Sequence, residues 1–89
     1  MAKTIYVKYY CMDIDYVTAD LSIIEQDCQE WVAEHHTDYH VEHDFNRWVE
    51  GRPYPHTNAG EDEAWEDYAE YLFESGKWGD YSWDEVCLK

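Results

Sequence analysis

Acidic side chains dominate this sequence: its 89 residues carry 21 Asp and Glu against 6 Lys and Arg, a formal net charge of −15. Lys and Arg make the contacts to nucleic-acid phosphates and to anionic membranes, so this charge excludes ordinary nucleic-acid binding and argues against adhesion to an anionic membrane. A high net charge predicts disorder only where apolar residues are scarce. Here 45% of the residues are hydrophobic and 18% are aromatic, so we expect a folded domain with a strongly electronegative surface.

The length fits a single domain that spans residues 1–89. No stretch approaches the roughly 18–20 apolar residues of a transmembrane helix. The N-terminal segment lacks the apolar core and the small-residue cleavage site of a signal peptide. Cys11, Cys28 and Cys87 form no CxxC pair, which is typical of reduced, structural thiols rather than of a disulfide framework. We therefore expect a cytoplasmic protein.

The first part of the chain has the pattern of β-strands. Residues 3–11 are β-branched and aromatic, and their alternation gives large side chains to both faces, as in a strand at the centre of a sheet. Residues 13–17 either continue this strand after a bend or form a second strand. Further along, residues 38–43 alternate Tyr39 and Val41 with polar side chains, which predicts another short strand.

The segment after the first strands has helical periodicity. Ser22 and Glu25 form a capping box at its start. The apolar stripe that follows predicts a helix over about residues 22–36. Its members are Ile24, Cys28, Trp31, Val32 and His35.

A second long helix is predicted over about residues 60–75. Asn58 and Glu61 resemble a cap pair, and Gly76 supplies the stop. The helix has a wide apolar stripe, made of Ala64, Trp65, Tyr68, Ala69, Tyr71, Leu72 and Phe73.

Two shorter helical turns complete the expected fold. Asp44 can cap one that carries Phe45 and Trp48, with a strand running on through this region as the alternative. Ser82 and Glu85 repeat the capping box and predict one or two final helical turns. Together these elements predict an α+β fold in which a small antiparallel sheet, built from residues 3–17 and 38–43, packs against two main helices.

The segment 61–74 concentrates the charge, with seven acids and no base. Asp62, Glu66, Glu70 and Glu74 recur every fourth residue and form one ridge, in which neighbours are about 6 Å apart along the helix axis. Glu63 and Asp67 flank this ridge. Like charges at this spacing weaken a helix by a few tenths of a kcal/mol per pair, so the ridge opposes the stability of its own helix.

Two interpretations of the ridge compete. The first is a solvated outer face that keeps a small protein soluble, but solubility needs a net charge of only about 2–8 in magnitude. The second is mimicry of a phosphate backbone, because the carboxylate spacing is close to that of neighbouring phosphates along one DNA strand. Such a surface would pair with Lys and Arg in the nucleic-acid groove of an enzyme. A second row of carboxylates is available in Asp27, Glu30 and Glu34, with Asp13 and Asp15 as further candidates.

On the composition of the whole chain and the acidic segment 61–74, the sequence resembles the phage-encoded DNA-mimic inhibitors. These are the anti-CRISPR and anti-restriction proteins and the inhibitors of uracil-DNA glycosylase. The likeness is one of class, carried by no sequence motif. It implies a viral protein without enzymatic activity that acts in the host cytoplasm and binds a host nuclease, Cas complex or repair enzyme. Members of the class also act at assembly or allosteric surfaces, so both modes of inhibition stay open.

Other chemistry has weaker support in the sequence. His35, His36, His40 and His43 lie among acids and leave open a metal-responsive adaptor, but there is no HExxH motif and no adjacent cysteine pair. Cys28 lies on an apolar stripe and is expected in the core rather than as a nucleophile. The sequence has no P-loop, no GxSxG motif and no dinucleotide fingerprint. We expect no enzymatic activity, no metal site and no cofactor.

The large aromatic residues divide into two groups. Those on apolar stripes are expected in the core, together with one leucine: Trp31, Trp48, Trp65 and Leu72. The others lie in less periodic segments and suit either core closure or a protein contact: Tyr54, Trp78, Tyr81 and Trp83.

Overall fold

Four strands and three helices follow one another along residues 3–88, the part of the chain that the computed structural model describes. The fold is α+β with an antiparallel sheet, which confirms the predicted class, and the helical turn expected at Phe45 and Trp48 is part of a third, longer helix. In chain order the elements are β1 (Lys3–Tyr10), β2 (Asp13–Thr18), α1 (Leu21–His35), α2 (Tyr39–Val49), α3 (Asn58–Ser75), β3 (Lys77–Trp78) and β4 (Tyr81–Leu88).

The sheet has the strand order β2-β1-β4-β3, so the first strand lies inside it, as its two large-residue faces predict. Residues 13–18 form a separate strand, β2, which resolves the alternative left open by the sequence. The chain reverses between β1 and β2 at Cys11, whose φ of 56° is in the left-handed region. β1 pairs with β4 along its whole length, from Lys3 opposite Leu88 to Tyr10 opposite Tyr81.

The predicted helical turns at the C-terminus are wrong, because Tyr81–Leu88 is the strand β4. The Ser82 and Glu85 pair has the spacing of a capping box, but neither residue caps a helix here. A helix of one or two turns cannot offset the cost of its own nucleation. Pairing with β1 instead gives every residue of this segment a partner across the sheet.

The predicted strand at residues 38–43 is also wrong, because this segment opens the helix α2. Alternation over only four residues does not distinguish a strand from a helix. The helical signal extends further, since Val41, Phe45, Trp48 and Val49 follow the i, i+4, i+7, i+8 pattern of one helix face. Phe45 is buried, and the other three are half-buried against it.

Helices α1 and α3 confirm the two long periodic segments and correct their starting points. α1 begins one residue earlier than predicted, and its cap is Asp20, whose carboxylate accepts the Ser22 backbone N–H at 3.0 Å. α3 is capped by Thr57, whose hydroxyl accepts the Gly60 N–H at 3.0 Å. Gly76 ends α3 in the left-handed conformation, with φ of 81°, as the sequence predicts.

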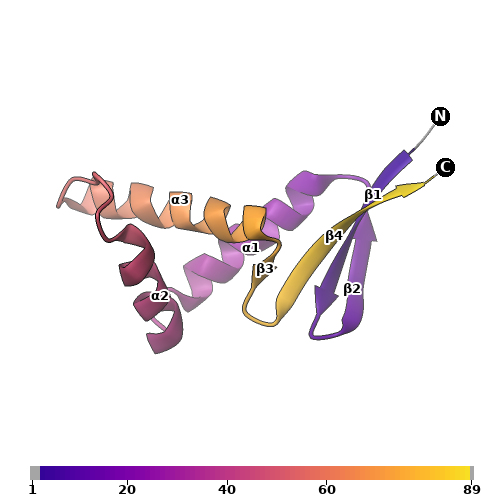
Figure 1. The fold of residues 1–89 in the computed structure, drawn as a ribbon, viewed down its shortest axis with the longest axis horizontal. Coiled ribbons are helices and arrows are strands. Elements are labelled where there is room, and N and C mark those ends of the chain that lie inside the picture. The colour runs from indigo at the N-terminus through magenta and orange to yellow at the C-terminus, as the bar shows by residue number, and fades with distance from the viewer. Residues whose placement is uncertain (1–2, 89) are drawn as a thin grey trace.

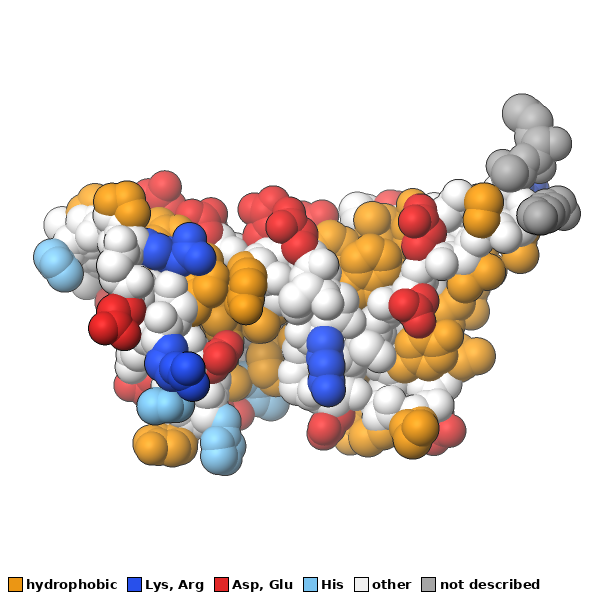
Figure 2. Space-filling view, viewed as in Figure 1, with side chains coloured by type: hydrophobic (Ala, Val, Ile, Leu, Met, Phe, Trp, Pro, Cys, Tyr) orange, Lys and Arg blue, Asp and Glu red, His pale blue; other side chains and the backbone are white. Residues whose placement is uncertain are grey.

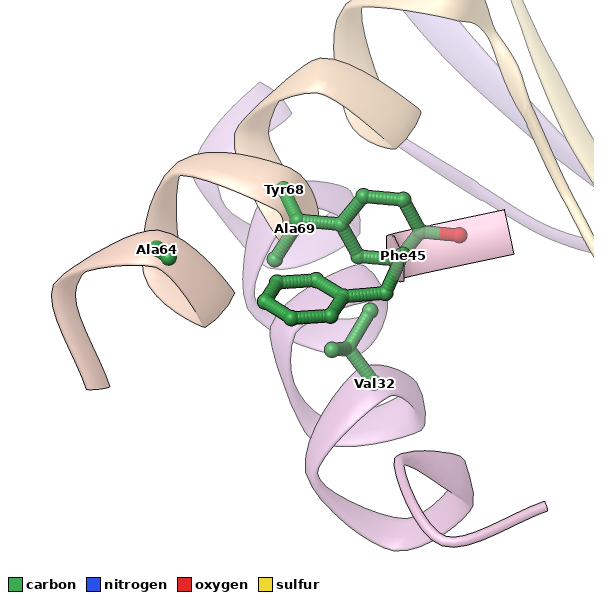
Figure 3. Packing of buried hydrophobic residues seen from close by; sticks show 5 residues of the cluster. All are labelled: Val32, Phe45, Ala64, Tyr68 and Ala69. Carbon is green, nitrogen blue, oxygen red and sulfur yellow. The ribbon is translucent and has the colours of Figure 1, made fainter. Parts of the chain in front are cut away.

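A first core cluster lies between the three helices (Figure 3). The Phe45 ring from α2 stacks on Trp65 of α3, with centroids 3.7 Å apart. It also meets the edge of Tyr68, which is 2% exposed. Tyr68 donates a hydrogen bond to Asp44, so its polar end is satisfied at the margin of the core. The buried members are Val32, Phe45, Ala64, Tyr68 and Ala69.

A second core cluster joins α1 and α3 to the sheet. Its buried members are Ile24, Cys28, Phe73 and Trp78. Cys28 is fully buried, which confirms its expected place in the core. This burial raises the pKa of its thiol to about 12 and keeps it protonated at neutral pH. Trp83 stacks on Phe73 at 5.1 Å and donates its indole N–H to the Phe73 carbonyl. Trp78 and Trp83 thus help to close the core, one of the two roles that the sequence leaves open for them.

The helices lie on one face of the sheet and extend away from it, giving a body of 48 × 26 × 18 Å (Figure 1). Lys3 and Leu88, the first and last residues that the structure describes, lie opposite each other on β1 and β4. Within residues 3–88 no helix has the length and apolar character needed to cross a bilayer.

Candidate partner-binding surface

The predicted acidic ridge lies on one continuous helix, α3. Asp62, Glu66, Glu70 and Glu74 are all exposed, as is the flanking Glu63. Acidic side chains follow this helix along the upper edge of the molecule in Figure 2. Within residues 3–88 the ion pairs involve only Lys8 and His35. The exposed ridge therefore has no internal cation and is free to meet one from another molecule.

A groove runs beside the ridge, between α1 and α3. It consists of two adjoining hollows of about 560 Å³ and about 330 Å³ that share part of their lining. Ridge residues Asp62, Glu66 and Glu70 border it from α3, and Glu25 borders it from α1. The remaining lining is mostly apolar or uncharged: Gln29, Val32, Ala33, His36, Trp65 and Ala69, with Asp67 also contributing. Carboxylates thus face this α1–α3 groove from both helices.

Asp67 has a structural partner within the chain. Its carboxylate accepts a hydrogen bond of 2.6 Å from the Tyr54 hydroxyl, which raises the pKa of Tyr54. This bond ties the proline-containing loop before α3 to the helix. Tyr54 is half-buried and packs on the first core cluster, so its role here is core closure. Asp67 is less available to a partner than the other predicted ridge residues.

Asp27 also has a partner within the chain, because it forms an ion pair with the buried Lys8 of β1. The Lys8 Nζ lies 3.2 Å from Asp27 and 3.1 Å from Asp15, and Tyr16 donates a second hydrogen bond to Asp27. Lys8 is only 7% exposed and lies over the ring of Tyr81, 4.3 Å from its centroid. The cluster fixes α1 on the sheet. Asp27 therefore serves the fold, and the structure gives it no place on the proposed contact surface.

The ionisation of these groups favours the folded state at neutral pH. Burial lowers the pKa of Lys8, but hydrogen bonds and charges from Asp15 and Asp27 outweigh it and raise the pKa. Burial, followed by the bond to Asp27, raises the pKa of Tyr16. Burial and the bond to Asp44 raise the pKa of Tyr68 in the same way. Each group holds its proton more tightly in the folded chain than in the unfolded one.

We therefore expect stability to fall at alkaline pH. The contributions of Cys28 and Tyr68 are fully present below their unfolded pKa values, near 9 and 10, and are lost as the pH rises towards their folded values. The free energy of unfolding should fall by about 1.4 kcal/mol per pH unit for each group ionised only in the unfolded state. Urea unfolding with reductant at pH 8 to 11 measures this. Tyr68→Phe should reduce the slope, and a flat profile to pH 11 would contradict the account.

The predicted second row does not join the ridge as a unit. Glu30 and Glu34 are exposed on α1 but lie outside the lining of the α1–α3 groove. The α1 carboxylate that does face the ridge is Glu25, whose position in the sequence predicts a capping box instead. The rotation of α1 about its axis decides between these residues. The apolar stripe predicts which face of α1 is buried, but which flank of that face meets α3 depends on how the elements pack, and local spacing does not encode it.

Trp65 also lines the groove, a position that the sequence does not predict. It packs on the first core cluster, as predicted, yet it is half-buried and also lines the α1–α3 groove. One face of the ring thus serves the core while its margin is open to a ligand. An aromatic ring among carboxylates suits the aliphatic stem and the cation of Arg or Lys.

The histidines lie around the start of α2 and do not form a metal cluster. His35 pairs with Asp38 at 2.7 Å, and His36 packs edge-on against Trp65. His43 stacks on Tyr39. Among the described residues, no three His, Cys, Asp or Glu side chains come together in a way that could hold a metal ion.

No protein-family model, no curated protein sequence and no solved structure matches the chain.

Proposed function

We propose that this protein is a stoichiometric inhibitor that binds the basic nucleic-acid groove of an enzyme or complex, such as a Cas effector, a restriction nuclease or a repair enzyme. The contact surface is the acidic ridge of α3 with the adjoining α1–α3 groove. One observation carries the proposal. The exposed carboxylates of the ridge form no ion pair within residues 3–88 and are arranged along a groove.

The physical argument begins with the cost of the ridge. Its like charges destabilise α3 by a few tenths of a kcal/mol per pair, and no described cation relieves them. A basic partner would convert this repulsion into attraction. The net charge of −15 also steers a basic surface towards the protein before contact, and salt screens that attraction over about 8 Å at physiological ionic strength.

The groove adds shape to the charge. A Lys or Arg of the partner can lay its aliphatic stem on Trp65 and Ala69 while its cation meets Glu25 on one side and Glu66 or Glu70 on the other. A flat acidic surface would not favour a long basic side chain over a small cation. Among the carboxylates that the sequence singles out, those on the ridge are therefore preferred to Glu30 and Glu34.

Capture and competition test the proposal. The protein is immobilised, exposed to a bacterial lysate and eluted with a salt gradient, and the released protein is identified by mass spectrometry. We expect a nucleic-acid-binding protein whose affinity falls at least about tenfold between roughly 0.05 and 0.5 M salt. An excess of the nucleic acid that this partner binds should displace it.

Two results would count against mimicry. A captured protein that binds no nucleic acid would overturn the proposed partner class. A nucleic-acid-binding protein that stays bound under excess nucleic acid would place the contact on an assembly or allosteric surface instead. The inhibition is proposed for the host cytoplasm, where such enzymes act.

A further inference from the structure

The face of the sheet turned away from the helices is largely apolar. Lys8 points to α1 through Asp27, so the alternation of β1 places Ile5, Val7 and Tyr9 on the opposite face. Residues directly across an antiparallel ladder share a face. The registers with β2, β4 and β3 therefore add Ile14, Val17, Ser82, Asp84, Val86, Leu88 and Lys77, and Lys3 completes this outer sheet face.

This pattern departs from that of an antiparallel sheet with one face in water. Such a sheet normally alternates apolar residues on the core side with polar residues on the solvent side. Here Ile14 is 64% exposed and Val17 is 51% exposed, and Val86 and Leu88 are also exposed. Figure 2 shows apolar side chains gathered at the sheet end of the molecule. Val7 lies between these strands and is only 6% exposed, so β2 and β4 contribute most of the accessible apolar surface. Exposed apolar residues gathered on one face mark an interaction site.

The outer sheet face is also nearly free of charge. Among the described residues, its side chains with a formal charge at neutral pH are Lys3, Lys77 and Asp84, which leave a net charge of +1. The chain as a whole has a net charge of −15, so the excess acid lies elsewhere, much of it on the helices. A strongly basic partner finds no electrostatic complement on this face, whereas a second copy of the same face meets only a small net charge and a largely apolar surface.

We propose that two copies of this chain associate through their outer sheet faces, sheet against sheet, in an isologous dimer. The helices project from the other face of each sheet (Figure 1). Each molecule is 48 Å long, so this docking directs the two acidic ridges away from each other. At 0.15 M salt the Debye length is about 8 Å, so the repulsion between the two ridges is then weak, and it grows as the salt is lowered. The inference does not depend on the proposed function.

The size of the face sets the strength of the association. β1 and β4 have eight residues each and β2 has six, so the three strands cover at most roughly 26 by 14 Å from the rise per residue and the strand spacing. That area is below the roughly 800 Å² per partner of a standard stable interface. The dimer should therefore dissociate on dilution. Because salt screens the repulsion between two chains of net charge −15, added salt should strengthen the dimer, opposite to its expected effect on a basic partner.

Sedimentation equilibrium of the purified protein tests the proposal. The apparent mass should rise from 10.8 kDa towards twice that value with concentration, and more readily in about 0.5 M than in 0.1 M salt. Val17→Lys lowers the negative charge, yet it should weaken the dimer at least about tenfold, because an isologous interface contains each substitution twice. Ile23→Lys is the matched control. Ile23 is 45% exposed on α1, and its substitution changes the charge equally and should leave the dimer intact.

Several outcomes would overturn the proposal. A wild-type chain that stays monomeric at all concentrations in both salts would refute it, and so would a Val17→Lys variant that dimerises like wild type. A monomeric wild type whose captured partner is lost on Val17→Lys would assign the outer sheet face to a different protein. Far-UV circular dichroism confirms that each variant is folded, and lysine is well tolerated on an edge strand such as β2.

Discussion

Replacing Glu66 and Glu70 by lysine is expected to weaken binding to the basic partner at least about hundredfold. Coupling between close charge pairs across an interface reaches about 1.5–7 kcal/mol, and each 1.4 kcal/mol is a factor of ten. The same change should not weaken the fold. Each introduced lysine would lie at the i, i+4 spacing from a remaining acid, Asp62 or Glu74, so two repulsive pairs become attractive. Titration of the partner by calorimetry and a thermal melt measure the two effects separately.

The matched control is Glu30→Lys with Glu34→Lys. This pair changes the net charge by the same amount and is exposed on α1 outside the α1–α3 groove. It should reduce only the long-range attraction, by less than about tenfold at physiological salt. Equal losses for the two double variants would mean that overall charge, rather than the ridge, holds the partner. Undiminished binding by the ridge variant at low and moderate salt would refute mimicry by α3.

Truncating Tyr68 to alanine should cost about 3–5 kcal/mol of folding free energy. Tyr68 is 2% exposed and touches the rings of Phe45, Trp48 and Trp65, so the lost ring leaves a cavity where three helices meet. That cost is a large part of the roughly 5–15 kcal/mol available to a small domain. Urea unfolding at neutral pH measures it.

Two further substitutions separate the causes of this loss. Tyr68→Phe keeps the ring and removes only the hydrogen bond to Asp44, which should cost about 1 kcal/mol. Tyr71→Ala removes the same ring from a site on α3 that is 48% exposed and should cost far less than Tyr68→Ala. A loss for Tyr71→Ala as large as that for Tyr68→Ala would contradict the assigned core.

The candidate surface was predictable only in part. The spacing of the ridge follows from the pitch of one helix, so Asp62, Glu66, Glu70 and Glu74 could be placed together without tertiary information. The sequence does not predict that Asp27 and Asp67 have partners within the chain. Asp27 accepts a hydrogen bond from Lys8 and Asp67 accepts one from Tyr54, and each donor belongs to a separate segment. Such contacts depend on how the elements pack, which local spacing does not encode.

The sequence by itself determined β1, α1 and α3. A long helix forms its hydrogen bonds within its own segment, and its apolar stripe then selects the face to be buried. Only the tertiary structure decided α2 and β4, since both segments are short and their patterns fit more than one conformation. Phe45 selects the helix for α2 by packing on Trp65 and Tyr68. Pairing with β1, at the other end of the chain, selects the strand for residues 81–88. The same pairing creates the outer sheet face, which belongs to no single segment of the sequence.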